Sequence, residues 1–297
     1  MPRTTRTATC WALLTLAGCC TNQTKQTPPP PTAPAPPVAT TPAPGAEAEG
    51  AHLTFHGTPL FAANCQLPLA NPGDTEAFDE ECGNEGEPED SDKEARAAEY
   101  TAKNNLCADA SAPMDLTFPD FKKLQTDLAH IDVATGNSGR SVSDRSVLSD
   151  LPLARGRQAG EGKVVRVVGL ATVKASKSNE GVNCHSTAEG KTDIHINVSP
   201  DGVECDGVVV EIIPHRRPEH WTHDEAANLL DQSIVRVTGQ LFLDSRHSVT
   251  PRTAPYKCPT PERISLWEVH PVYTMDICRR GSLEECTAND DSVWKAF

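Results

Sequence analysis

Five segments in the second half of the chain have the hydrophobic pattern of β-strands. In Thr192–Val198 apolar and polar residues alternate strictly, with Ile194, Ile196 and Val198 on one side and polar residues on the other. A period of two residues places successive side chains on opposite faces of a strand. We therefore predict five strands that turn an apolar face toward a common core. The other four are Lys163–Lys174, Gly207–Ile213, Ser233–Leu243 and Arg263–Ile277.

Helices are predicted between and before these strands. Ser91–Glu94 and Thr222–Glu225 have the spacing of a capping box, in which a hydroxyl and an acid three residues later bond the first free N–H groups of a helix. The first predicts a helix that ends near Asn104, and the second predicts a short helix between the third and fourth strands. A further helix is expected over Pro119–Ile131, where apolar residues recur every three or four positions, and we expect it to pack on the strands.

The order strand-strand-strand-helix-strand-strand resembles the OB fold, a five-stranded Greek-key β-barrel. The resemblance is one of topology, covers residues 159–280 and is carried by no sequence motif. It implies a mainly β fold with some α, in which Gly169 stands where a barrel strand bends. It also implies a binding face around the second and third strands, which this fold uses for oligonucleotides, oligosaccharides and other ligands.

The N-terminus has the order of features found in bacterial lipoproteins. Arg3 and Arg6 precede a short apolar run, Ala8–Ala17, which is too short for a spanning helix of roughly 20 residues and is typical of a secretory signal. The following Leu16–Cys19 resembles the lipobox of these lipoproteins. The resemblance implies cleavage before Cys19, diacylglycerol on its sulfur, and an acyl chain such as palmitate on the new N-terminus. An ordinary cleaved signal peptide is the alternative.

The residues after the lipobox indicate where the protein is held. Cys20 stands where lipoproteins retained in the inner membrane carry Asp, so the resemblance implies the outer membrane of the cell envelope. Pro28–Pro37 favours a polyproline II conformation, which extends about 3.1 Å per residue and suits a tether. The expected organisation is a signal peptide over 1–18, a lipid-anchored linker over 19–50, an acidic and partly helical extension over 51–158, the barrel over 159–280 and a tail over 281–297.

Charge is distributed unevenly along the chain. The formal net charge is −14, and between Asp74 and Glu99 there are 12 acidic residues against two basic ones. Gly160–Arg280 is close to neutral, with 14 Lys and Arg against 16 Asp and Glu. The predicted barrel therefore lacks the excess of basic residues that binding to duplex nucleic acid needs.

The cysteines predict disulfide bonds. An even number remains after the signal and the anchor are set aside, and the compartment implied by the signal is oxidising. We expect Cys184–Cys205 and Cys278–Cys286 as local pairs. No Cys-x-x-Cys occurs, so a cysteine–zinc site lacks its usual spacing. The eight cysteines are Cys65, Cys82, Cys107, Cys184, Cys205, Cys258, Cys278 and Cys286.

Acidic and histidine residues recur at strand spacing in the predicted barrel. Asp193 and His195, and likewise Glu268 and His270, stand two positions apart, which puts each pair on one face of its strand. In an OB barrel the second, third and fifth strands are neighbours, so these pairs and Glu211 can meet. Imidazole and carboxylate ligands suit zinc or another divalent ion. The candidate metal ligands are Asp193, His195, Glu211, Glu268 and His270.

The same pattern has a structural interpretation. Glu268 and His270 share a side with Leu266, so either the strand bulges or two polar residues point into the barrel. A buried acid must be paired or bind a metal ion. A Glu–His pair that closes the barrel end, or a bulge that turns Trp267 and Val269 inward, accounts for the pattern without a ligand.

A second candidate site is the segment Pro214–Trp221, which joins the third strand to the following helix at an expected barrel mouth. Its Arg side chains suit an anionic group, and its Trp suits stacking on a sugar. The alternative is an ordered loop in which Trp221 packs at the start of the helix. Two residues after the fourth strand are expected on the same rim. The candidate ligand-binding residues are His215, Arg216, Arg217, Trp221, Asp244 and His247.

These features predict a lipid-anchored envelope protein with a non-catalytic binding domain. The expected partners are a saccharide, an anionic small molecule or an envelope protein, and no cofactor is expected apart from a divalent metal such as zinc at the candidate ligands. The sequence has no nucleophile elbow, P-loop or dinucleotide fingerprint. One alternative is a divalent-metal-dependent hydrolase, such as a phosphodiesterase, that uses Asp193, His195, Glu268 and His270. Another is a structural component of an envelope complex.

Overall fold

The computed structural model describes the barrel region and parts of the extension before it. The described residues are 54–55, 58–59, 82–83, 85–88, 93–106, 108, 112–131, 142, 145–174, 179–188, 190–214, 217–218, 220–249 and 263–297. The predicted signal peptide, the lipidation site Cys19 and the Pro-rich linker lie outside these residues, as do His215 and Arg216 of the predicted barrel mouth.

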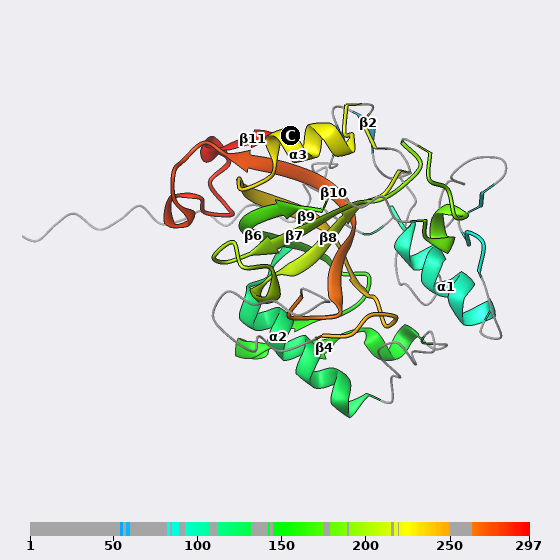
Figure 1. Ribbon diagram of the computed structural model, residues 1–297. Coiled ribbons are helices and arrows are strands. Elements are labelled where there is room, and N and C mark those ends of the chain that lie inside the picture. Colours follow the sequence, from blue (N-terminus) through cyan, green and yellow to red (C-terminus); the bar gives the residue numbers. More distant parts are fainter. Residues whose placement is uncertain are drawn as a thin grey trace, which may run out of the picture. The chain divides into compact units, whose positions relative to one another are not determined.

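Five strands form a closed β-barrel of mixed strand direction (Figure 1). β6 pairs with β7 and β7 with β8, both antiparallel, whereas β8 lies parallel to β10. β9 pairs antiparallel with β10 on one side and with β6 on the other, which closes the barrel. All five predicted strands are confirmed. They are β6 (Val164–Val173), β7 (Ile194–Ser199), β8 (Val208–Ile212), β9 (Ile234–Leu243) and β10 (Trp267–Cys278).

The apolar positions of the strands form the barrel core, as their alternation predicts. Ile194, Ile196 and Val198 are fully buried in one cluster with the inward residues of the other strands. Asp193 and Asn197 have the opposite parity, yet they are buried as well. A second layer of chain therefore covers the outer face of this part of the barrel.

Three α-helices lie on different sides of the barrel (Figure 1). The predicted cap of the third is confirmed, because the side chain of Thr222 accepts a hydrogen bond from the backbone N–H of Glu225 at 3.1 Å. The second helix begins with a capping box between Thr117 and Asp120, and a Pro follows in its first turn as predicted. The helices are α1 (Lys93–Lys103), α2 (Phe118–Asp127) and α3 (His223–Leu229).

Helix α2 packs on the barrel through its apolar stripe. Phe121 and Leu124 are fully buried in the barrel core cluster. Gly169 of β6 allows this close approach, because a Cβ there would lie 2.9 Å from the ring of Phe118 and 2.7 Å from the carbonyl oxygen of Ser199. The predicted contact of the helix is confirmed, and β6 needs glycine here because both the neighbouring strand β7 and helix α2 approach it closely.

Helix α1 and the turn after it lie against the outer face of β9 and β10. Gln240 donates to the carbonyl oxygen of Ala102 at 2.9 Å and accepts from the side-chain amide of Asn105 at 2.7 Å. The hydroxyl of Tyr273 donates to the carbonyl oxygen of Asn105 at 2.9 Å. Ala102 also packs on Phe242, whose side chain is fully buried. The acidic extension therefore supplies the second layer over this face.

Trp267 and Val269 of β10 point into the core, as one interpretation of the sequence pattern expected. Glu268 and the following His270 lie on the other face by ordinary alternation. The pairing of β10 with β9 shifts register only after these residues, between Val269 and Val272 and again between Val272 and Thr274, so the bulge does not cause the inward turn. Gly239 of β9 accommodates the bulge, because a Cβ there would lie 2.4 Å from the carbonyl oxygen of Pro271.

Short elements complete the described structure. β3 pairs with β6 and β11 with β10 at the edges of the barrel sheet, and the other short strands form two separate pairs. The short strands are β1 (Thr54–Phe55), β2 (Thr58–Pro59), β3 (Met114–Asp115), β4 (Leu151–Pro152), β5 (Gln158–Ala159) and β11 (Trp294–Ala296). The 3-10 turns are η1 (Leu128–His130), η2 (Arg145–Leu148), η3 (Ala154–Gly156), η4 (Gly181–Asn183), η5 (Glu204–Asp206), η6 (Leu283–Glu285) and η7 (Asp291–Val293).

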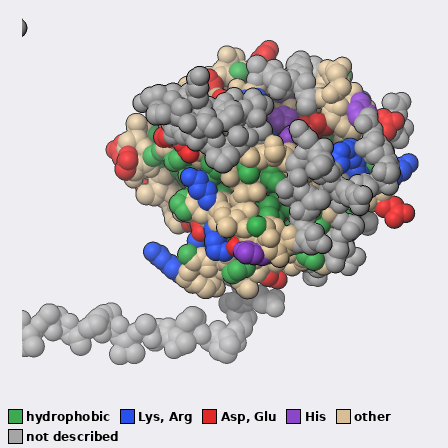
Figure 2. All heavy atoms as spheres, turned by 60° about the horizontal axis from the view of Figure 1, so that its bottom comes forward, with side chains coloured by type: hydrophobic (Ala, Val, Ile, Leu, Met, Phe, Trp, Pro, Cys, Tyr) green, Lys and Arg blue, Asp and Glu red, His purple; other side chains and the backbone are tan. Residues whose placement is uncertain are grey.

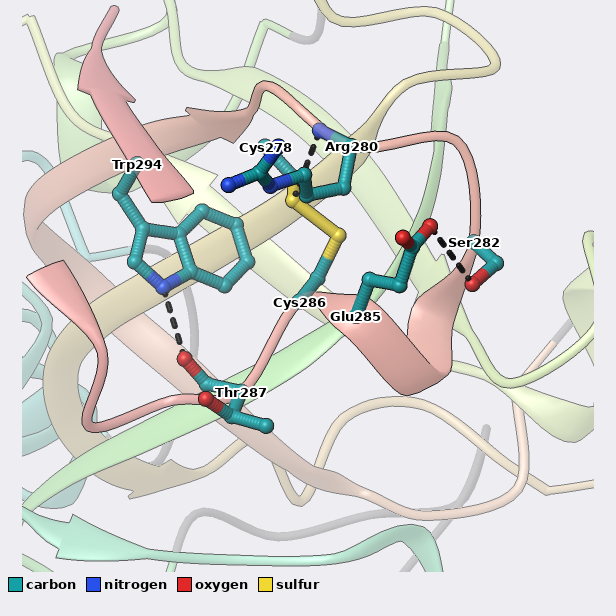
Figure 3. Close-up of a disulfide and its surroundings, with 7 residues drawn as sticks. All are labelled: Cys278, Arg280, Ser282, Glu285, Cys286, Thr287 and Trp294. Atoms are coloured by element: carbon teal, nitrogen blue, oxygen red, sulfur yellow. Dashed lines mark hydrogen bonds between the residues drawn. A yellow bond between two sulfur atoms is a disulfide. The ribbon is translucent and has the colours of Figure 1, made fainter. Parts of the chain in front are cut away.

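Disulfide bonds hold both ends of the described chain. The predicted Cys278–Cys286 bond is confirmed and closes the turn after β10, beside Trp294 (Figure 3). The predicted Cys184–Cys205 pair is wrong, because Cys184 is bonded to Cys82. That bond joins residues 102 positions apart, so it fastens the segment before α1 to the loop before β7. A loop of this length is worth roughly 4–5 kcal/mol in the chain-entropy model. The short separation in sequence favoured a bond between Cys184 and Cys205, but the fold brings Cys82 next to Cys184 instead.

Among the described residues, no helix has the length and apolar character needed to cross a membrane.

Substitution of Gly239 tests the fit between β9 and the bulge. We expect Gly239→Ala to lower the free energy of unfolding by about 1–3 kcal/mol, because the added methyl meets backbone that cannot move without breaking strand pairing. Gly281→Ala is the matched control, since a Cβ there meets no atom within 4 Å, and we expect it to change the free energy by less than about 0.5 kcal/mol. Denaturant unfolding with the disulfides intact measures both, and equal effects would contradict the packing argument.

Candidate functional site

A row of acidic and histidine side chains lies on the outer face of β7, β8 and β10. His195 of β7 stands opposite Glu211 of β8 in the antiparallel register. β10 pairs with β8 at Val269, a core residue. Neighbours along a strand alternate between faces, so Glu268 and His270 lie on the same outer face as Glu211. The spacing of these residues in three strands therefore brings them to one place.

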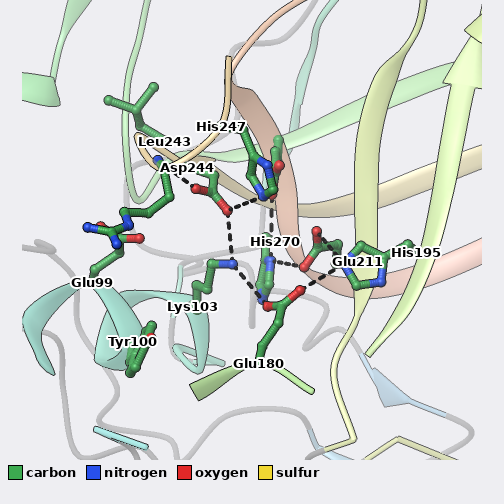
Figure 4. A network of polar contacts seen from close by, with 12 residues as sticks. Glu99, Tyr100, Lys103, Glu180, His195, Glu211, Leu243, Asp244, His247 and His270 are labelled. Atoms are coloured by element: carbon green, nitrogen blue, oxygen red, sulfur yellow. Dashed lines mark hydrogen bonds and ion pairs between the residues drawn. The ribbon is translucent and has the colours of Figure 1, made fainter. Parts of the chain in front are cut away.

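The carboxylate of Glu211 is at the centre of this cluster. Its Oε1 lies 3.1 Å from Nε2 of His195, and its Oε2 lies 2.8 Å from Nδ1 of His270 (Figure 4). Glu268 adds its Oε2 at 3.8 Å from Nδ1 of His270, while its Oε1 pairs with Arg263. Glu211, Glu268 and His270 are buried, whereas the side chain of His195 is 17 % exposed. The cluster is thus shielded from solvent at Glu211, Glu268 and His270, and it is open to solvent at His195.

Asp193 is the carboxylate with the least compensation. It directly precedes β7, is fully buried, and neither of its side-chain oxygens has a hydrogen-bond partner among the described residues. One of these oxygens lies within 4.8 Å of ligand atoms of Glu211 and His270. Burial, together with the negative charge of Glu180, raises the pKa of Asp193 to about 6. The positive charges of His270 and His195 offset the effect of burial only in part, and no hydrogen bond to the described residues stabilises this carboxylate.

Glu180 joins the cluster from the loop between β6 and β7. Its Oε1 lies 3.1 Å from Nε2 of His195, and its Oε2 lies 3.5 Å from Nζ of Lys103. The residue directly precedes η4, whose end is fastened by the Cys82–Cys184 disulfide. Burial opposes ionisation of this carboxyl, but the charge of Lys103 and the hydrogen bond with His195 lower its pKa to about 2. Glu180 is therefore a carboxylate in the folded protein.

The ammonium group of Lys103 at the end of α1 connects two parts of the network. It lies 3.0 Å from Oδ2 of Asp244, in addition to its contact with Glu180. Asp244 also faces His247, with Nε2 at 3.5 Å (Figure 4). Lys103 and Asp244 are buried, and the side chain of His247 is 43 % exposed. Burial alone would raise the pKa of Asp244, but the charge of Lys103 lowers it to about 2. Helix α1 thus contacts the barrel through the buried ion pair of Lys103 as well as through apolar packing.

The two histidines of the cluster favour their charged forms in this environment. Burial opposes a proton on either ring, but the charge of Glu211 outweighs it. The pKa of His270 is raised to about 9, and the pKa of His195 is raised well above its ordinary value. The charges of the same two histidines hold the pKa of Glu211 well below its usual range, despite its burial. Without a bound cation, two imidazolium groups therefore flank the Glu211 carboxylate.

All five predicted metal ligands converge, and the structure adds residues that the sequence did not indicate. Glu180 and Lys103 have no strand spacing to reveal them, because they come from a loop and from the extension. Asp244 and His247 were predicted on the rim with Trp221, but they lie in the network of Lys103 instead. The nearest available signal for Glu180 was its position four residues before a disulfide cysteine.

The predicted barrel mouth is not an open aromatic site at Trp221. The indole is buried, stacks on Phe297 with ring centroids 5.2 Å apart, and donates its N–H to the carbonyl oxygen of Phe297 at 3.1 Å. Arg217 donates to the carbonyl oxygen of Thr192 at 2.9 Å. This burial does not support the stacking of Trp221 on a sugar; it agrees with the alternative in which Trp221 packs within the protein, although its contact is the C-terminal residue.

The cluster contains two sets of donors that fit a metal ion. One ligand atom from each of Glu180, His195 and Glu211 lies within 4.8 Å of the others, and the same holds for Asp193, Glu211 and His270. A cation at either position would meet carboxylate and imidazole donors, which suit Zn²⁺, Mn²⁺ and Fe²⁺ better than soft ions such as Cu(I). It would also supply the missing partner of Asp193.

No protein-family model, curated protein or solved structure matches this chain.

Removal of the Lys103 charge tests how far the network depends on α1. We expect Lys103→Met to lower the free energy of unfolding by roughly 3–5 kcal/mol, because the buried Asp244 would lose its cation and the partly exposed Glu180 would lose one of its two partners. Lys123→Met is the control, since its ion pair with Asp127 lies on the solvent side of α2 and is worth less than about 1 kcal/mol. Denaturant unfolding measures the difference, and a loss of the same size in both variants would contradict the buried network.

The raised pKa of His270 predicts a pH dependence of stability in chelator. The folded state holds the proton up to about pH 9, whereas an unfolded histidine releases it near pH 6.5. The stabilisation is therefore complete below about pH 6.5 and is lost as the pH rises to about 9. We expect the difference in unfolding free energy between the wild-type protein and His270→Gln to shrink over this range. Urea unfolding at a series of pH values measures it, and a constant difference would show that the ring is neutral in the fold.

Proposed function

We propose that this protein is a lipid-anchored envelope protein that binds a divalent metal ion on the outer face of its barrel. The ion lies between β7, β8 and β10, beneath the edge of α1, with Asp193, Glu211 and His270 as its first ligands. The function is non-catalytic binding, in agreement with the expectation from the sequence, but its site is on the barrel face and not at the mouth.

The observation that carries this proposal is the state of Asp193. Both oxygens of a fully buried carboxylate lack a hydrogen-bond partner among the described residues. Such a group costs several kcal/mol unless it is neutralised, and no nearby Lys or Arg forms an ion pair with it in the described structure. Glu211 and His270 offer their own ligand atoms within 4.8 Å. A divalent cation at this point satisfies all three groups at once.

The topology supports an OB-like barrel as the scaffold. The strand order around the barrel is β6-β7-β8-β10-β9, β8 is parallel to β10, and α3 lies in the chain between β8 and β9. This order supports a Greek-key arrangement like that of an OB barrel, whose second and third strands, corresponding to β7 and β8, commonly form the binding face. His195 and Glu211 stand on the outer side of these two strands.

Location at the envelope rests on the sequence and on the cysteines. The lipobox-like segment that ends at Cys19 supports a lipid anchor, and the Pro-rich segment supports a tether. The disulfides Cys82–Cys184 and Cys278–Cys286 suit an oxidising compartment outside the cytoplasm. On the face drawn in Figure 2, the described Lys and Arg side chains lie apart among acidic and apolar ones, which does not favour a polyanionic partner.

A metal-dependent hydrolase is the second candidate function. The observation that favours it is solvent access at one side of the cluster, where the side chains of Glu180 and His195 are 27 % and 17 % exposed. A catalytic ion needs such an open side for water and substrate. Metal-loaded protein that leaves ester and phosphodiester substrates intact would exclude this candidate.

Metal binding by the purified full chain tests the proposal. After removal of bound ions with chelator, we expect titration with Zn²⁺ or Mn²⁺ to show saturable binding, and Asp193→Asn to weaken it by at least roughly 10–100-fold, since this is the usual cost of removing even a supporting group. Asp127→Asn, in the solvent-side ion pair of α2, is the matched control and should bind as the wild type does. Calorimetry and elemental analysis measure both quantities. Absence of binding in the wild-type chain, or equal binding by Asp193→Asn, would refute the site.

A further inference from the structure

We infer that the site on the barrel face holds two metal ions, bridged by the carboxylate of Glu211. This inference rests on the proposed metal-binding function and deepens it. The inner ion is the one bound by Asp193, Glu211 and His270, and the outer ion is bound by Glu180, His195 and Glu211.

The arrangement around Glu211 is that of a bridging carboxylate. His195 approaches Oε1 at 3.1 Å, and His270 approaches Oε2 at 2.8 Å, so each imidazole faces a different oxygen (Figure 4). The two three-residue groups share Glu211 and no other residue. A single ion between both histidines would use the two oxygens together, whereas ligands that separate onto opposite oxygens suit one ion at each.

The outer group also places two carboxylate oxygens at a single ring nitrogen, and a cation at this position would compensate both. Nε2 of His195 lies 3.1 Å from Oε1 of Glu180 and 3.1 Å from Oε1 of Glu211. One ring nitrogen carries at most one proton and can direct it well to one acceptor. Two carboxylate oxygens held at the same nitrogen repel each other in a site of low exposure. An ion that takes the place of that proton can accept electron pairs from all three atoms.

Glu268 is a fourth candidate ligand for the inner ion. Glu268 keeps Oε2 buried without a hydrogen bond in the described structure, at 3.8 Å from Nδ1 of His270. With it, the two positions together offer two histidines and four carboxylates: Glu180, Asp193, His195, Glu211, Glu268 and His270. Carboxylate-bridged pairs of Fe or Mn in helical bundles use the same numbers of carboxylates and histidines, although all four of their carboxylates are Glu. Here strands and a loop present them instead of helices.

The two positions differ in their access to solvent. Asp193, Glu211 and His270 are buried, whereas Glu180 and His195 are partly exposed. We therefore expect the inner ion to bind first and to exchange slowly, and the outer ion to bind more weakly and to exchange quickly. This difference allows the two ions to be loaded and removed separately.

Mn²⁺ titration of the chelator-treated full chain tests the inference. We expect two equivalents to bind to the wild-type chain, and electron paramagnetic resonance to show the signal of an exchange-coupled pair once the second is bound. His195→Gln should bind one equivalent, with the uncoupled signal of a single ion. Glu180→Gln should weaken the second equivalent while it keeps the first. The solvent-side variant Asp127→Asn is the control and should keep both equivalents and the coupled signal.

The possible results separate this inference from the proposed function. One equivalent in the wild-type chain, with no change in His195→Gln, would overturn the pair and leave the metal site of Asp193 in place. Two equivalents without exchange coupling would overturn the Glu211 bridge. No binding would overturn both the pair and the proposed function. The wild-type spectrum decides the inference even if a variant fails to fold.

Discussion

Burial of a charged side chain costs free energy unless an opposite charge compensates it, and this constraint determines how the side chains are arranged on the outer face of the barrel. Glu211 stands in the middle of that face, 1 % exposed, with histidines as its ion-pair partners in the described structure. Glu180 contacts His195 on the side of the ring nitrogen that faces Glu211, and the pairing of Val269 with β8 places His270 on the face of Glu211. Lys103, Asp244 and Arg263 extend the alternation of charges outward. The network is therefore one unit, in which no member can lose its charge without cost to its neighbours.

The acidic extension shields this network of charges from solvent. Ala102 covers Phe242, and the turn after α1 is fastened by Gln240 and Tyr273. The Cys82–Cys184 disulfide holds the segment before α1 against the loop that carries Glu180. A sheet face that would carry solvated polar residues in an isolated barrel thus becomes an interior. Low dielectric strengthens each pair within it, and it makes an incomplete partner set, such as that of Asp193, expensive.

A metal ion offers a consistent account of this arrangement. The raised pKa values of the two histidines favour protons at the cationic positions when no ion is present, and the oxygens of Asp193 still have no hydrogen-bond partner among the described residues. Ions that replace these protons bring more charge to the same places and reach Asp193 as well. Metal affinity and proton affinity then compete at the same ring nitrogens, as they do at other histidine sites. The proposed metal site would for this reason link stability, pH and metal content.

The sequence by itself determined the local elements and the acidic and histidine residues at the centre of the cluster. Alternation in segments such as Thr192–Val198 predicts the strands, and the two-residue spacing of acid and histidine predicts a shared face, because strand geometry is local and periodic. Tertiary structure alone decided what covers that face. The pairing of Cys184 with Cys82, the arrival of Lys103 over Asp244 and the burial of Trp221 on Phe297 join residues that are far apart in sequence. Such contacts follow from how whole layers pack, and no local period records them.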